Sequence, residues 1–181
     1  MAIDEAEFEA LRREVQYLSD RQQILDCVNL YNRGLDRLDA DLIRAAYHPD
    51  GIDHHGPFLG TVDEFVPFAI EVEATFAATH HGISTHHCEI DGDVAHAESY
   101  VHFFVQMKGK PVIGAGGGRY IDRLERRDGK WAIAVRRLAM DWTFEVPSSE
   151  WLGPDWAKFS GRRDRQDIVY QRPLQQPDKS M

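Results

Sequence analysis

The 181-residue chain contains 43% hydrophobic residues, which is enough for one sizeable core, and it is too short for two ordinary domains. Its 30 acidic and 21 basic side chains give a net charge of −9, which repels phosphate backbones and anionic lipids. The longest apolar runs fall far short of the roughly 20 residues that a membrane helix needs. We therefore expect one soluble, cytoplasmic domain with no nucleic-acid or membrane partner.

The first 80 residues carry helical patterns. Apolar residues recur at helical spacing from Phe8 to Leu18, and a capping-box pattern at Ser19 predicts that a second helix begins there and runs to Leu35. Asp39 is expected to cap a short third helix that ends at the sequence HPDG. A loop is expected over residues 52–60, and Thr61 starts a fourth helix with another capping box.

The second half of the domain reads as strands separated by tight turns. Asp-Gly pairs and a Lys-Gly-Lys-Pro stretch each suit a chain reversal. The four predicted strands are His80–Ile90, Val94–Lys108, Val112–Arg127 and Trp131–Trp142. Helices followed by an antiparallel meander predict an α+β domain over residues 1–145. Residues 146–181 read as a C-terminal extension that docks in part through Trp151, Trp156 and Phe159.

Four of the nine histidines lie within residues 80–87. Strand alternation sends His81 and His87 to one face and His80 and His86 to the other, and leaves open which face is buried. His81, His87 and Asp36 could converge on a metal, but adjacent histidines on a strand point apart and no HExxH or Cys/His motif is present. We expect no metal.

Two other features receive structural interpretations. The glycine-rich run GAGGGR, residues 114–119, lies inside a strand pattern rather than between a strand and a helix, so it predicts a bulge or bend in the sheet instead of a nucleotide site. Cys27 and Cys88 are too few for a disulfide framework and are expected to be small, buried hydrophobic side chains.

Four blocks of sequence, in order and spacing, resemble the SnoaL-like branch of the nuclear transport factor 2-like superfamily over residues 10–145. They are YNRGLDRLDADLIRAAYHPDG, DHHGPFLGTVDEF, HHGISTHHCEIDGDVAHAESY and GGRYIDRLERRDGKWAIAVRRLAMDW. The resemblance implies a cone in which helices wrap a bent antiparallel sheet around one apolar pocket. Members include scytalone dehydratase, lindane dehydrochlorinase, bile acid 7α-dehydratase and proteins with no catalytic role, so the fold alone does not define an activity.

The resemblance also implies site residues. Asp36 and His81 match an Asp–His pair of the catalytic members, Tyr31 keeps the spacing of a tyrosine that contributes in one of them, and Arg136 is the nearest match to an arginine on the last strand. A lysine of the dehydrochlorinase has no clear counterpart. The chemistry is coherent, because a carboxylate orients an imidazole and stabilises the imidazolium that forms when the imidazole takes a proton.

The sequence therefore predicts a cofactor-free lyase of the dehydratase type, or an isomerase, that acts on a hydrophobic, cyclic small molecule. Tyr31 or a water is the expected proton donor to a leaving hydroxyl. The alternatives are a non-catalytic subunit of the same fold and a ligand-binding protein. We expect a homo-oligomer, with dimer and trimer both open. The pocket is expected to be lined by Tyr47, Phe65, Phe68, Phe76, His80, Phe103 and Phe104.

Overall fold

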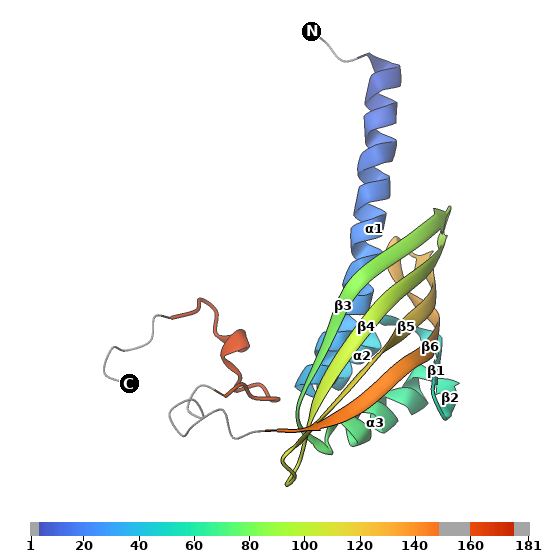
Figure 1. Ribbon diagram of the computed structural model, residues 1–181. Coiled ribbons are helices and arrows are strands. Elements are labelled where there is room, and N and C mark those ends of the chain that lie inside the picture. Colours follow the sequence, from blue (N-terminus) through green and yellow to red (C-terminus); the bar gives the residue numbers. More distant parts are fainter. Residues whose placement is uncertain (1–3, 149–159, 176–181) are drawn as a thin grey trace.

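The computed structural model describes residues 4–148 and 160–175. It has a mixed α+β architecture with three helices on one face of a curved six-stranded sheet (Figure 1). The helices are α1 (Glu5–Arg37), α2 (Ala40–Ala45) and α3 (Val62–Glu73). The strands are β1 (Tyr47–His55), β2 (Phe58–Thr61), β3 (Phe76–Asp91), β4 (Val94–Met107), β5 (Val112–Arg127) and β6 (Lys130–Pro147). The C-terminal segment carries one short 3-10 helix, η1 (Ile168–Tyr170).

The sheet order is β2-β1-β6-β5-β4-β3, so the four long strands form the expected antiparallel meander. Gly92 and Gly129 occupy the predicted Asp-Gly turns with φ of 58° and 77°, the left-handed region that glycine adopts without a steric penalty. The α+β fold class is confirmed. Trp151, Trp156 and Phe159, which were expected to dock the extension, lie outside the described residues.

The first helix is continuous, and the prediction of two helices that meet at Ser19 is wrong. The Asp20 carboxylate does not cap a helix start. It is buried and accepts hydrogen bonds from Trp131 Nε1 at 2.9 Å and from Arg126 Nη1 at 3.0 Å. Long-range contacts therefore explain the polar Asp20 in the middle of the helix, next to the predicted cap Ser19. The N-terminal half of α1 projects beyond the sheet (Figure 1).

The expected loop over residues 52–60 is also wrong, because β1 and β2 form a hairpin there. The HPDG sequence lies inside β1, after α2 has already ended at Ala45. β1 pairs in parallel with β6, and its polar residues find distant partners: His48 Nε2 contacts the Glu125 carbonyl oxygen at 2.8 Å. The polar residues of this segment predicted a loop, but pairing with distant residues stabilises it as a strand.

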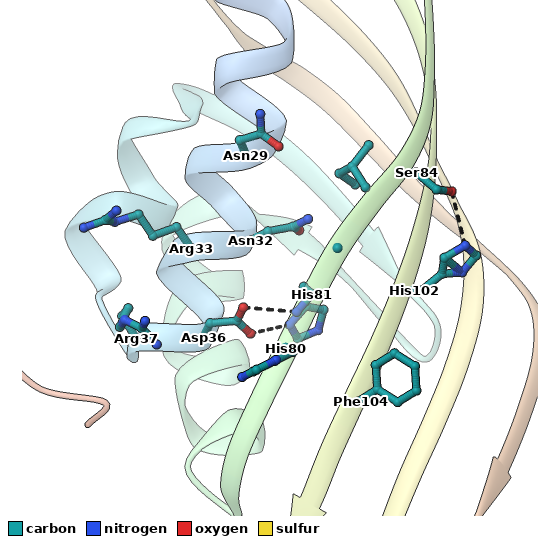
Figure 2. Close-up of a pocket in the computed structure, with 12 residues that line it drawn as sticks. Asn29, Asn32, Arg33, Asp36, Arg37, His80, His81, Ser84, His102 and Phe104 are labelled. Carbon is teal, nitrogen blue, oxygen red and sulfur yellow. Dashed lines mark hydrogen bonds and ion pairs between the residues drawn. The ribbon is translucent and has the colours of Figure 1, made fainter. Parts of the chain in front are cut away.

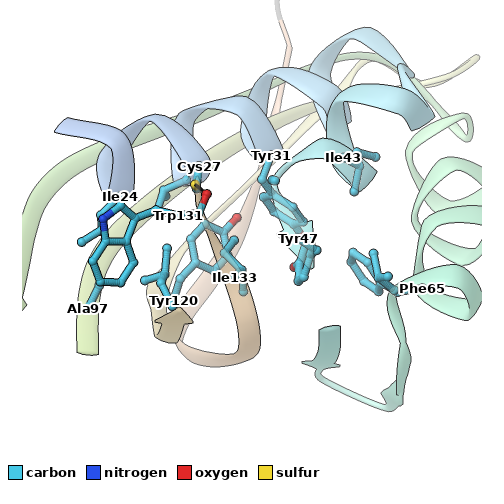
Figure 3. Packing of buried hydrophobic residues seen from close by; sticks show 14 of the residues in the cluster. Ile24, Cys27, Tyr31, Ile43, Tyr47, Phe65, Ala97, Tyr120, Trp131 and Ile133 are labelled. Atoms are coloured by element: carbon cyan, nitrogen blue, oxygen red, sulfur yellow. Dashed lines mark hydrogen bonds between the residues drawn. The ribbon is translucent and has the colours of Figure 1, made fainter. Parts of the chain in front are cut away.

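The core lies between the helices and the concave face of the sheet. Figure 3 shows aromatic and aliphatic side chains packed beneath α1, and both cysteines are buried as expected. The ladder between β5 and β6 shifts register between Gly117 and Gly118, which confirms the predicted irregularity in the glycine run. Among the described helices, none has the length and apolarity to span a membrane.

Candidate active site

Asp36 and His81 lie in direct contact at the junction of α1 and β3 (Figure 2). His81 Nδ1 lies 2.8 Å from Asp36 Oδ1, and the His81 backbone amide donates to Asp36 Oδ2 at 3.0 Å. The Thr79 hydroxyl donates to Asp36 Oδ1 at 3.0 Å. Because an ionised carboxylate only accepts hydrogen bonds, the Nδ1 that faces Asp36 carries a proton, and in the neutral imidazole the lone pair of Nε2 is free.

The structure answers which histidines face inward. His81 is largely buried on the helix-facing side of the sheet, whereas His80 is exposed. A register shift between Ile83 and His86 then reverses the alternation, so His86 bonds the buried Ser99 hydroxyl at 2.8 Å and His87 is exposed. His81, His87 and Asp36 therefore do not converge, and within residues 4–148 and 160–175 no group of three or more His, Cys, Asp or Glu side chains could hold a metal ion.

His81 lines an apolar cavity of about 330 Å³ between α3 and the sheet, a volume that suits a small organic ligand, and its Nε2 lies near Glu73, which lines the same cavity. Phe103 stands directly opposite His81 in the β3–β4 ladder, with ring centroids 5.8 Å apart. A recess of about 60 Å³ adjoins it. The cavity is lined by His55, Val72, Glu73, Phe76, His81, Val101, Phe103, Val105, Tyr120, Leu138 and Met140, and the recess by residues that include Tyr31, Phe65 and Phe68.

Three residues expected in the pocket lie elsewhere. Tyr47 is packed in the core, where its hydroxyl donates to buried Asp53, and it lines neither the cavity nor the recess. His80 lines a second, open crevice of about 630 Å³ between α1 and β3, which Asp36 and His81 also line (Figure 2). Phe104 is 53% exposed on the convex face of the sheet, because it neighbours inward-facing Phe103.

Tyr31 is fully buried, and its hydroxyl has no hydrogen-bond partner among the described residues. Its ring stacks on Phe65 with centroids 6.1 Å apart, and its edge lies in the 60 Å³ recess. Burial raises the pKa of the Tyr31 phenol well above its ordinary value. This environment favours the neutral phenol, which can act as a hydrogen-bond donor.

Arg136 is fully buried, with Arg137 exposed beside it. Its guanidinium donates to both carboxylate oxygens of Asp122, at 2.8 and 2.7 Å. It also lies between two aromatic rings, 4.3 Å from the Tyr31 centroid and 4.1 Å from the Tyr120 centroid. Arg136 does not line the cavity. It contacts the site indirectly, through Tyr120, which lines the cavity, and Tyr31, which lines the recess.

Two charged residues that the sequence analysis missed complete the site. Glu73, at the end of α3, is 8% exposed, and its Oε1 lies 3.9 Å from His81 Nε2. Arg163, from the C-terminal segment, lies 3.3 Å from Glu73 Oε2. Burial raises the pKa of Glu73, although His81 and Arg163 both oppose the shift. The sequence contained a signal for Glu73, because it follows Phe65 and Ala69 at four-residue spacing on the buried face of α3. No neighbouring residue in the sequence indicates that Arg163 lies at the site.

Arg163 joins the C-terminal segment to both sides of the site. It donates to the backbone carbonyls of Leu35 and Asp36 at 2.9 Å and to that of Glu73 at 2.7 Å. It also donates to the Thr79 hydroxyl at 3.0 Å. The first two carbonyls belong to the last turn of α1, where the Leu38 amide also donates to Leu35 at 3.2 Å, so Arg163 completes the hydrogen bonding of the helix end that carries Asp36.

Comparison of the chain with known protein families and structures identifies its family. A model of the SnoaL-like domain matches residues 16–137, so the chain belongs to the SnoaL-like family. Curated proteins give no significant match. A putative scytalone dehydratase from Novosphingobium aromaticivorans DSM 12444 is similar at a TM-score of 0.65 and 21% identity, over 76% of this chain and 95% of that one.

Two further solved structures are similar. The hexachlorocyclohexane dehydrochlorinase LinA-type3 from Novosphingobium barchaimii LL02 matches with a TM-score of 0.70 and 16% identity, over 78% of this chain and 99% of that one. A cystatin-like protein of unknown function from Nostoc punctiforme PCC 73102 matches with a TM-score of 0.58 and 20% identity, over 67% and 91%. At these low identities the structural similarity establishes the fold alone. The prediction of a nuclear transport factor 2-like, cystatin-like fold is confirmed.

Proposed function

We propose that the protein is a cofactor-free lyase of the dehydratase type, or an isomerase, in which His81 removes a proton from a carbon of a hydrophobic, cyclic small molecule. The observation that carries the proposal is the His81–Asp36 contact at 2.8 Å beside an apolar cavity. His81 is the base and Asp36 orients it. Two rivals from other classes, a non-catalytic subunit and a ligand-binding protein, share the fold but do not need this dyad.

The dyad meets the requirements of a general base. Asp36 accepts the Nδ1 proton, which leaves Nε2 to take a proton from a ligand in the cavity. As the imidazolium forms, its positive charge lies against the Asp36 carboxylate. General-base catalysis of this kind supplies about 10²–10⁴-fold in rate. In a dehydratase the substrate then loses water, whereas in an isomerase His81 returns the proton at another carbon.

The surroundings of the dyad support an apolar, ring-shaped substrate. Phe76, Phe103, Val101, Val105 and Leu138 give the cavity its apolar walls. Flat aromatic and branched aliphatic walls pack well against a ring and exclude water from the reacting carbon. Similarity to structures named as a putative scytalone dehydratase and a dehydrochlorinase, both elimination enzymes by name, agrees with this chemistry.

The test is a screen of cyclic β-hydroxyketones for enone formation by ultraviolet absorbance, starting with 3-hydroxycyclohexanone and a 3-hydroxydecalone. Wild type is expected to form an enone, and H81N is expected to lose about 10²-fold or more of the rate. H80N is the matched control, because His80 is adjacent in sequence and exposed. Equal rates for H81N and wild type would refute the dyad. Ketone binding without turnover would favour the ligand-binding alternative.

We also propose that the protein forms a homo-oligomer, dimer or trimer, by contact with further copies of this chain. Phe8, Leu11, Val15 and Leu18 are 50–57% exposed on the projecting part of α1. Their spacing of three, four and three residues is that of a coiled-coil seam. Light scattering should show an oligomer that L11E/L18E disrupts and A10E, on the opposite side of the helix, preserves. A monomeric wild type would contradict the proposal.

A further inference from the structure

We propose that Glu73 is a second catalytic residue of this site, the acid that protonates the leaving hydroxyl and then recovers its proton from His81. The inference rests on the proposed function and goes beyond it, because it assigns the second proton transfer to a residue outside the Asp–His pair. Glu73 lines both the cavity and its recess, whereas Tyr31 lines only the recess.

Each ring nitrogen of His81 has a carboxylate side chain beside it. Asp36 contacts Nδ1 at 2.8 Å, and Glu73 Oε1 lies 3.9 Å from Nε2. The nitrogen that takes a proton from the substrate therefore has a carboxyl group as its next neighbour. A substrate in the cavity that presents a carbon to Nε2 places an adjacent substituent within reach of Glu73, because both groups line the cavity and lie 3.9 Å apart.

Arg163 closes a ring of polar contacts around these groups. It lies 3.3 Å from Glu73 Oε2 and 3.0 Å from the Thr79 hydroxyl, and that hydroxyl donates to Asp36. Arg163 offsets the charge of one carboxylate. Under this proposal Glu73 and His81 together hold one further proton, either on the Glu73 carboxyl, which makes both side chains neutral, or on His81 Nε2.

The neutral pair is the state that an elimination needs at its start. Burial raises the pKa of Glu73, which favours the protonated carboxyl. Asp36 also raises it, while His81, Arg163 and Thr79 lower it. The titratable, charged or hydroxyl-bearing groups that surround Glu73 are His81 and Thr79 on β3, Asp36 and Tyr31 on α1, His55 on β1, Tyr120 on β5 and Arg163.

The proposed step balances in protons and electrons. His81 Nε2 takes the proton from the carbon beside the ketone, and the electron pair of the broken C–H bond moves onto the ketone as an enolate, which can take up deuterium before elimination. The enolate electron pair then forms the new C=C bond. The C–O bond breaks with its electron pair on oxygen, which takes the Glu73 proton and leaves as water. The imidazolium then returns its Nε2 proton to the Glu73 carboxylate across the 3.9 Å gap, which a water molecule or a side-chain rotation can close.

The experiment follows 3-hydroxycyclohexanone in D₂O and measures two rates: deuterium uptake at C2, which reports the base, and enone formation, which also needs the acid. E73Q is expected to keep deuterium uptake within a few-fold of wild type and to lose about 10²-fold in enone formation. H81N is expected to lose both. E71Q, at an exposed position two residues earlier on α3, is the matched control and is expected to keep both.

Each outcome decides a separate point. Undiminished enone formation by E73Q, with deuterium uptake dependent on His81, overturns the role of Glu73 and leaves the proposed function intact. No deuterium uptake above buffer by wild type refutes both. A substrate-free check uses the ¹³C signal of the Glu73 carboxyl: its titration midpoint is expected above the ordinary glutamate range, and an ordinary midpoint overturns the inference. Melting curves of E73Q confirm that the variant is folded.

Discussion

Asp36 holds His81 by both its ring and its backbone: one carboxylate oxygen meets Nδ1 at 2.8 Å and the other accepts the backbone amide at 3.0 Å. The end of α1 is thereby joined to the edge strand β3, and the imidazole orientation is fixed by the same contacts that join helix to sheet. Catalytic geometry built on two rigid elements in this way needs no loop closure to assemble it.

The variant D36N tests the orienting role. The asparagine amide can donate where the carboxylate only accepts, which favours the His81 tautomer that carries its proton on Nε2. We expect the rate of enone formation to fall about 10²–10⁴-fold. D41N, at an exposed position on α2, is the control. Activity of D36N within a few-fold of wild type would show that the carboxylate is not needed.

Removal of Arg163 should affect both stability and titration. R163M removes the Arg163 donor from the carbonyls of Asp36 and Glu73 and one of the two donors to Leu35, and we expect a loss of about 1–3 kcal/mol in the free energy of unfolding. Because Arg163 lowers the pKa of Glu73, its removal should raise that pKa further.

Arg165 provides the matched control, since its ion pair with Asp39 at 2.9 Å involves a largely exposed arginine side chain. R165M should cost less than about 1 kcal/mol. Urea unfolding measures the stabilities, and carboxyl NMR measures the Glu73 midpoint. If R163M and R165M lowered the free energy of unfolding equally and left the Glu73 midpoint equally unchanged, the role assigned to Arg163 would be wrong.

The buried Arg136–Asp122 pair should be essential to the fold. R136M leaves the Asp122 carboxylate buried without its two donors, and we expect a loss of about 3–5 kcal/mol in the free energy of unfolding. The double variant R136M/D122L removes both charges and should recover part of that loss. A single variant as stable as wild type in urea would refute this account.

Stability should also depend on pH through Glu73. Its pKa is raised in the folded protein, so the folded state holds the Glu73 proton more tightly than the unfolded state. The stabilisation from that proton is fully present below the unfolded pKa of about 4.3 and is lost as pH rises through the higher folded pKa. Wild type should therefore lose stability relative to E73Q over this window. A constant difference in urea midpoints from pH 4 to 8 would contradict the shift.

Local signals in the sequence predicted much of the fold. The capping residues Asp39 and Thr61 mark the starts of α2 and α3, and the Asp-Gly turns and the Lys-Gly-Lys-Pro stretch delimit β3 to β6. The failures share one cause. Asp20 belonged to a predicted capping box and His48 to a predicted helix stop, but each polar side chain is satisfied by a partner far away in the sequence.

The site was predictable only in part, for the same reason. The resemblance paired Asp36 with His81, but alternation left the buried face of β3 open and put His87 on the same face as His81, an arrangement that the register shift between Ile83 and His86 prevents. Glu73 interrupts an apolar helix face and could have been noticed. Arg163 reaches the site from a separate polar segment, 90 residues beyond Glu73, and only the folded chain reveals that contact.

The most direct test of the account is deuterium uptake at C2 of 3-hydroxycyclohexanone in D₂O, with wild type, H81N and H80N compared at equal concentration. The account predicts uptake above the buffer rate for wild type and H80N, and a fall of about 10²-fold or more for H81N. Uptake by H81N equal to that of wild type would contradict the assignment of His81 as the base.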